Sequence, residues 1–187
     1  MALLGPDDND RRKIHAEITQ IVNQRLTLTT LGLTVFGVVI AWIIPKETPL
    51  RGSPMGVLPF IISTLLIVLL SVLFILNHSL KQMLRTLSTY MDASNASNWE
   101  KDWAAYRVKY SYIGYTKPQG IIFLFLGAFT TVFPFILKFA YGLKIDRIEV
   151  TIISTFIGFV YFFFVCMMSY HGWFSKEKDL FTNWKNL

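Results

Sequence analysis

Four long stretches of this chain contain no Asp, Glu, Lys or Arg. They are residues 26–45, 52–80, 118–137 and 150–175, and together they make up half of the 187 residues. A helix needs about 20 consecutive apolar residues to cross the roughly 30 Å hydrocarbon core of a membrane. Because each stretch reaches that length, the sequence predicts an all-α, polytopic integral membrane protein with four transmembrane helices.

The composition supports this class and argues against two others. Hydrophobic residues make up 53% of the chain, and charged residues make up 16%. Soluble domains average about 25% charged residues, so an ordinary soluble domain is not expected. Disorder requires few apolar residues and a high net charge, which is the opposite of this composition.

The basic residues predict the orientation in the membrane. Of the 18 Lys and Arg, 13 fall in the N-terminal segment, the central loop and the C-terminal tail. Lys and Arg accumulate on the cytoplasmic side of membrane proteins, so both termini and the central loop are expected inside. The connections 46–55 and 142–148 would then be short outside turns. We interpret the chain as a protein of the bacterial inner (cytoplasmic) membrane.

The predicted organisation alternates between cytoplasmic and transmembrane parts. Helical periodicity precedes span one and continues after span two. The amphipathic segment before span one is therefore expected to run on into it, and the helix of span two to continue to about Met91. The parts are a cytoplasmic amphipathic helix (1–25), a transmembrane hairpin (26–77), a cytoplasmic helical hairpin (78–117), a second transmembrane hairpin (118–171) and a cytoplasmic tail (172–187).

Three residues in the spans are predicted to govern helix packing. Gly37 and Ala41 form a small-xxx-small pair in a Thr-rich first span, which lets two helices approach closely in lipid. We expect this span to contribute to a homo-oligomer, and its Thr face could alternatively line a pore. Pro134 removes one backbone hydrogen bond of span three and is expected to kink it, with Thr130 able to bond the freed carbonyl.

The cytoplasmic segment 99–117 combines aromatic and basic residues. Four aromatic residues recur at helical spacing, and basic residues surround them. One interpretation is a helix on anionic lipid headgroups, another is packing against the extended second helix or a protein partner, and nucleic-acid binding is the least favoured. The predicted partner or lipid interface comprises Trp99, Lys101, Trp103, Tyr106, Arg107, Lys109 and Tyr110.

The sequence shows no pattern typical of an enzyme. The span interiors contain no ionisable residue, which argues against proton-coupled transport and intramembrane hydrolysis. His15, His78 and His171 lack the spacing and the companion ligands of a zinc site. We therefore expect no catalytic residue, no metal and no cofactor. Asn77, at the edge of span two, is expected to form hydrogen bonds at a helix end.

The general plan resembles small multi-span bacterial membrane proteins, including the membrane subunits of phage-defence systems. The resemblance covers the architecture of the whole chain: four spans, no exterior domain and a modest cytoplasmic layer. It implies a cytoplasmic protein partner and a role in defence. The first hypothesis is a non-enzymatic oligomeric membrane scaffold or sensor that couples the membrane to that partner. A pore-forming or membrane-perturbing effector is the alternative, and a small-molecule transporter ranks third.

Overall fold

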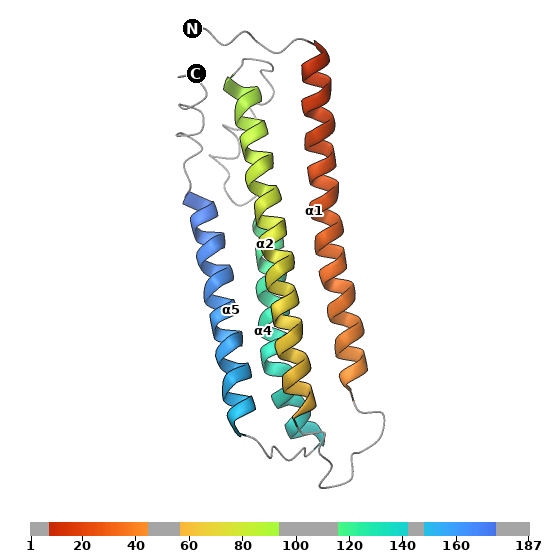
Figure 1. The fold of residues 1–187 in the computed structure, drawn as a ribbon, viewed down its shortest axis with the longest axis vertical. Helices are drawn as coiled ribbons and strands as arrows, with labels where there is room; N and C mark the ends of the chain where they lie inside the picture. The colour runs from red at the N-terminus through yellow and green to blue at the C-terminus, as the bar shows by residue number, and fades with distance from the viewer. Residues whose placement is uncertain (1–7, 45–56, 94–115, 142–147, 175–187) are drawn as a thin grey trace.

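The computed structural model describes residues 8–44, 57–93, 116–141 and 148–174, and these form four helices without a strand (Figure 1). The helices are α1 (Asp8–Ile43), α2 (Leu58–Ala93), α4 (Thr116–Tyr141) and α5 (Ile148–Phe174). All four are long and apolar enough to cross a membrane, by length and composition. The prediction of an all-α chain with four such helices is confirmed.

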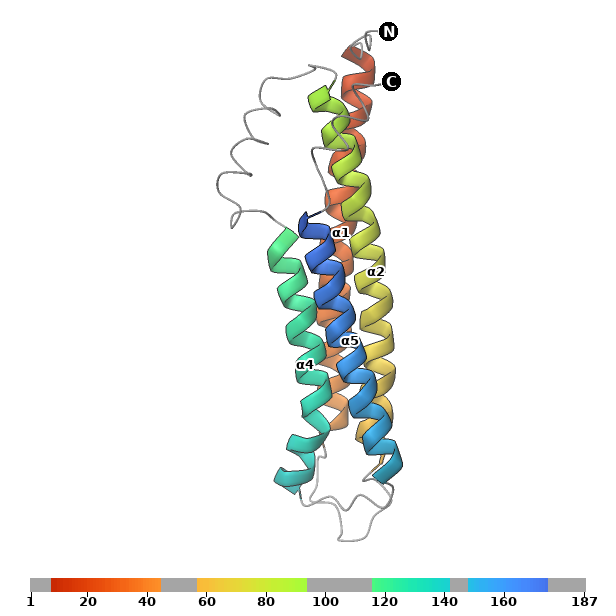
Figure 2. The same cartoon turned by 90° about the vertical axis from the view of Figure 1, so that its left-hand side faces the viewer.

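The helices form an elongated up-and-down bundle with α2 at its centre. Helix α2 packs against α1, α4 and α5, and α4 packs against α5. Helix α1 packs along α2 and meets α4 at only a few points, so it lies at one side of the bundle (Figures 1 and 2). Because α1 packs mainly against one helix, α2, most of its circumference faces outward.

Helices α1 and α2 are longer than a membrane is thick. Each has 36 residues, which corresponds to about 54 Å at 1.5 Å per residue. Both project beyond α4 and α5 at the end where α1 begins and α5 ends, which we call the polar end (Figure 2). The predictions that the N-terminal helix runs on into span one, and that the second helix continues to about Met91, are confirmed.

The core lies where α2, α4 and α5 meet. Its buried members are large aliphatic and aromatic side chains, and rings from α2 and α4 meet edge to face, as in Phe74 and Phe123, whose centroids are 5.6 Å apart. Such aromatic pairs add attraction beyond the burial of apolar area. The buried cluster consists of Leu66, Ile67, Leu70, Leu73, Phe74, Phe123, Leu126, Tyr161 and Val165.

Two glycines allow α4 and α5 to approach closely. A Cβ atom on Gly127 would collide with the ring of Tyr161, and one on Gly158 would collide with Thr131. The Tyr161 ring is held in place because its hydroxyl donates a hydrogen bond of 2.8 Å to the carbonyl oxygen of Phe123. Gly127 of α4 therefore leaves room for the Tyr161 ring of α5, and Gly158 of α5 leaves room for Thr131 of α4.

Pro134 is buried within α4, which continues on both sides of it. The carbonyl freed by this proline belongs to Thr130, four residues earlier. The Thr130 hydroxyl instead donates to the carbonyl of Leu126 at 2.7 Å. The prediction that Thr130 bonds the freed carbonyl is therefore wrong, because a Thr hydroxyl in a helix reaches back one turn rather than to its own carbonyl.

Replacing Gly127 with Ala should lower the free energy of unfolding by about 1–3 kcal/mol, because the added methyl group overpacks the contact with Tyr161. Gly37→Ala is the matched control, since nothing lies within 4 Å of a Cβ at Gly37. Unfolding of both variants in mixed detergent micelles measures the difference. Equal stability of the two variants would contradict the proposed α4–α5 packing.

Candidate functional site: a buried polar layer and an outward seam on α1

A layer of polar side chains crosses the bundle where the charge-free stretches end. Arg25 of α1, Asn77 of α2 and Gln119 of α4 lie together, although 52 and 94 residues separate Arg25 from the other two. On α5, Ser169 faces the neighbouring Gly120, because a Cβ on that glycine would lie 3.1 Å from the Ser169 hydroxyl. All four helices therefore contribute to this level, at the polar end of the apolar core.

Arg25 is the centre of the layer. Its side chain is buried, with 5% of the residue exposed. Its Nε donates to Asn77 Oδ1 at 3.0 Å, and its Nη2 donates to Gln119 Oε1. The guanidinium group thus links α1 to α2 and α4, the helix that α1 otherwise touches at only a few points.

Asn77 extends this network back to α1. Its Nδ2 donates to the Thr29 hydroxyl at 3.1 Å, and that hydroxyl donates to the Arg25 carbonyl at 2.9 Å. Asn77 and Thr29 are both buried. We refer to Arg25, Thr29, Asn77 and Gln119 as the polar layer. Because α2 continues well past Asn77, the prediction that this residue bonds at a helix end is wrong, and it bonds across helices instead.

More positive charge lies next to the polar layer, on α2. Lys81 is 8% exposed, and Arg85 follows it one turn later, so Asn77, Lys81 and Arg85 share a helix face. Lys81 experiences electrostatic repulsion from both Arg85 and Arg25. Among the residues that the structure describes, the salt bridges are two exposed pairs near the start of α1, and neither involves Arg25 or Lys81.

The groups of this cluster are positively charged hydrogen-bond donors. Neutral amide oxygens of Asn77 and Gln119 hold the guanidinium group of Arg25. Guanidinium and ammonium groups recognise anionic oxygens, with Arg as a planar fork and Lys as a point charge. No group of three or more His, Cys, Asp or Glu that could hold a metal occurs in the described part of the chain.

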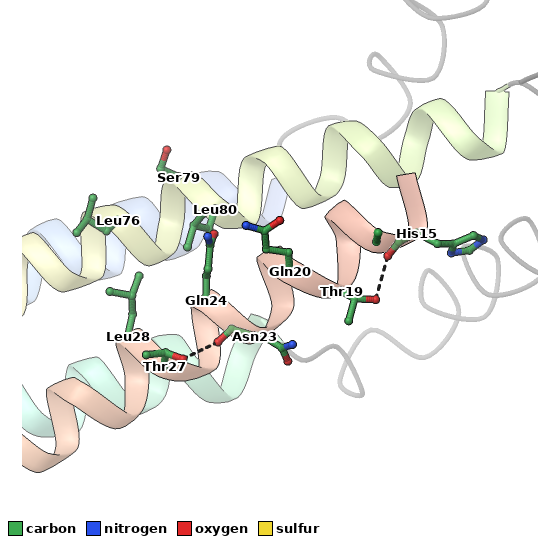
Figure 3. Close-up of a pocket in the computed structure, with 11 residues that line it drawn as sticks. His15, Thr19, Gln20, Asn23, Gln24, Thr27, Leu28, Leu76, Ser79 and Leu80 are labelled. Atoms are coloured by element: carbon green, nitrogen blue, oxygen red, sulfur yellow. Dashed lines mark hydrogen bonds between the residues drawn. The ribbon is translucent and has the colours of Figure 1, made fainter. Parts of the chain in front are cut away.

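A shallow groove of about 980 Å³ follows the α1–α2 junction beside the polar layer (Figure 3). From α1, Gln20, Gln24 and Leu28 point toward α2, where Leu76 and Leu80 lie. Asn23 and Thr27 of α1 also line the groove, and the Thr27 hydroxyl donates to the Asn23 carbonyl at 2.9 Å. The groove is therefore mixed in character, with amides from one helix and leucines from the other.

The outward face of α1 differs from every other exposed surface in the apolar part of the bundle. Small or uncharged polar residues recur along it at alternating intervals of four and three, and all of them are exposed. This is the 3.5-residue repeat by which two helices pack along a seam. We call this set the α1 seam, and it comprises Ala16, Gln20, Asn23, Thr27, Thr30, Thr34, Gly37 and Ala41.

The other helices show the contrast. Every exposed residue in the ranges 58–76 of α2, 119–140 of α4 and 150–169 of α5 is apolar, and most are large. Such surfaces suit lipid chains, which offer no hydrogen bonds. On α1, large residues such as Leu33 and Val38 flank the seam rather than fill it. From Thr27 to Ala41, the seam is thus the one polar strip within these exposed apolar surfaces.

The residues predicted from sequence fall into three groups. Gly37 and Ala41 lie on the α1 seam and contact no other helix closely, so close approach within the chain is made by Gly127 and Gly158 instead. Pro134 is buried in the bundle. The predicted lipid or partner interface lies outside the described residues, namely Trp99, Lys101, Trp103, Tyr106, Arg107, Lys109 and Tyr110.

Sequence reasoning missed the polar layer. Arg25 is one of the basic residues of the N-terminal segment that predict the orientation, and no role was predicted for Gln119. A signal was present, because Arg25, Asn77 and Gln119 all lie at the same end of their charge-free stretches once alternate helices are reversed. What the sequence does not contain is the rotation of each helix, which turns all three side chains inward.

Comparisons with models of known protein families, with curated proteins and with solved structures find no match for this chain. The resemblance to membrane subunits of phage-defence systems therefore stays a prediction. The polar layer and the α1 seam are the structural features that bear on function.

Replacing Gln119 with Ala should lower the free energy of unfolding by about 1–3 kcal/mol, because a buried donor of Arg25 loses its acceptor. Gln24→Ala removes a glutamine side chain from the exposed groove and should change the free energy of unfolding by less than about 0.5 kcal/mol. Denaturant titration in micelles compares the two. If Gln119→Ala is as stable as Gln24→Ala, Arg25 does not depend on its α4 partner.

Proposed function

We propose that this protein is a non-enzymatic, homo-oligomeric membrane scaffold or sensor that couples the membrane to a cytoplasmic protein partner. The observation that supports it best is the α1 seam, a continuous strip of small and polar residues that are all exposed on α1, with its first four residues along the α1–α2 groove. Small residues let helices approach closely in lipid, and interhelical hydrogen bonds add about 1 kcal/mol each. A second copy of α1 is the partner whose repeat matches this strip.

The shape of the bundle suits coupling to a cytoplasmic partner. Residues 8–24 of α1 and 78–93 of α2 extend about 24 Å beyond the polar layer, while α4 and α5 end near it (Figures 1 and 2). We call this pair the α1–α2 projection. The distribution of basic residues favours a cytoplasmic position for it. A change in how the α1 helices pack would move both sides of the membrane together, since each α1 is one continuous helix.

A pore is the second candidate, and the same strip favours it. In a ring of four or more copies, Asn23, Thr27, Thr30 and Thr34 would supply a polar lining along α1, because all four are exposed. Ion flux from liposomes that contain the purified protein separates the two functions. Flux that depends on the Thr residues favours the pore, and an oligomer without flux favours the scaffold.

Replacing Ala41 with Leu should weaken self-association about tenfold, because the larger side chain holds two α1 helices apart. Ala128→Leu is the matched control, since Ala128 is also an exposed alanine but lies on α4. The mass distribution of the protein in lipid nanodiscs, measured over a range of concentrations, gives the association constants.

Two results would contradict the proposal. One is a wild-type protein that stays monomeric at every concentration in nanodiscs. The other is equal weakening by Ala41→Leu and Ala128→Leu, which would show that oligomers do not form through the α1 seam. In either case the first helix has no part in assembly.

A further inference from the structure

The buried positive charge at the polar end lacks a counter-charge in the described part of the chain. Arg25 and Lys81 are both buried and repel each other. The hydrogen bonds that Arg25 donates to Asn77 and Gln119 satisfy two of its N–H groups. They do not neutralise its charge, because both acceptors are neutral amides. Burying a charge costs several kcal/mol unless an opposite charge or a set of hydrogen bonds compensates it.

Donors also remain at this position. A guanidinium group has five N–H bonds and an ammonium group has three. Arg25 uses two of its N–H groups within the described residues, toward Asn77 and Gln119. Lys81 is also buried, with 8% of its surface exposed, and no hydrogen bond to another described residue engages it. The cluster can therefore bind an anion without giving up its existing contacts.

The position along the bundle indicates which anion fits. The polar layer lies at the end of the charge-free stretches of α1, α2 and α4, each of which is long enough to cross the roughly 30 Å hydrocarbon core of a membrane. Lipid phosphates lie just outside the hydrocarbon core, at this level. Arg binds phosphate oxygens as a fork, and Lys adds a point charge, so a tetrahedral phosphate matches both groups.

We propose that Arg25 and Lys81 form a binding site for a phosphate group at the polar end of the bundle. The phosphate comes either from the headgroup of an anionic phospholipid or from a soluble phosphate, and both sources present the same oxygens. The site is built from residues of α1 and α2, and it does not require the oligomer or the partner proposed above.

The test uses the full-length protein, delipidated in a neutral detergent. Its melting temperature is measured during titration with phosphatidylglycerol, with zwitterionic phosphatidylcholine, and with inorganic phosphate against chloride at equal ionic strength. We expect phosphatidylglycerol, inorganic phosphate or both to raise the melting temperature in a saturable way. Stabilisation by the lipid alone identifies a headgroup site, and stabilisation by inorganic phosphate identifies a site for soluble anions.

Matched variants assign the effect to this site. Lys81→Gln should weaken the apparent affinity about tenfold, because one charge-assisted contact is lost. Lys13→Gln removes the same charge from the exposed surface of α1 and should change the affinity less than twofold. Lys81→Arg keeps the charge and should retain binding, which separates loss of the site from damage to the fold.

Two outcomes would overturn the proposal. In the first, neither phosphatidylglycerol nor inorganic phosphate stabilises the wild-type protein beyond phosphatidylcholine and chloride. In the second, Lys81→Gln and Lys13→Gln weaken binding equally, so that the anion responds only to overall surface charge.

Discussion

The arrangement of the bundle depends on one buried arginine, Arg25, whose hydrogen-bond acceptors lie on other helices. Arg25 reaches Asn77 on α2 and Gln119 on α4, and these bonds fix the heights of three helices relative to one another. Apolar packing alone allows helices to slide, because one leucine contact resembles the next. Hydrogen bonds between specific groups allow one register, and in an apolar surrounding their loss leaves an unsatisfied group.

Once α1 is fixed in this way, its remaining surface has to be explained. The face opposite Arg25 is the α1 seam, where a lipid-exposed helix would ordinarily carry large apolar side chains. Leu33 and Val38 on its flanks and the apolar surfaces of α4 and α5 show that the chain does place such residues outward elsewhere. The strip of Thr, Gly and Ala is therefore a local feature of α1. The proposed assembly through this helix rests on that strip, while the core between α2, α4 and α5 holds the single chain together.

The sequence was sufficient for the class of fold because that depends on one-dimensional properties. The lengths of the charge-free stretches predict four spans. The helical periodicity before span one and after span two predicts the long α1 and α2. Packing depends on helix rotation, which a sequence does not state. Gly37 and Ala41 have the same small-xxx-small spacing as Gly127 and Thr131, yet only the second pair lies against a neighbouring helix of the same chain.

The candidate site divides in the same way. In the sequence, Arg25 is one basic residue among several at a membrane edge. Its role becomes clear only from its contacts with α2 and α4. Asn77 was expected to form hydrogen bonds at a helix end, whereas its side chain is buried in the middle of α2 and bonds to residues of α1. Sequence reasoning recovers residues that act through periodicity, and it misses residues that act through contacts distant in sequence.

The most direct measurement is a double-mutant cycle between Arg25 and Asn77, with Arg25→Ala, Asn77→Ala and the double variant unfolded reversibly in mixed micelles. Their bond of 3.0 Å is buried and charge-assisted, so the two changes should be non-additive by about 1.5–3 kcal/mol. Additivity within about 0.5 kcal/mol would show that Arg25 and Asn77 do not interact in the folded protein. The polar layer would then not set the arrangement of the helices.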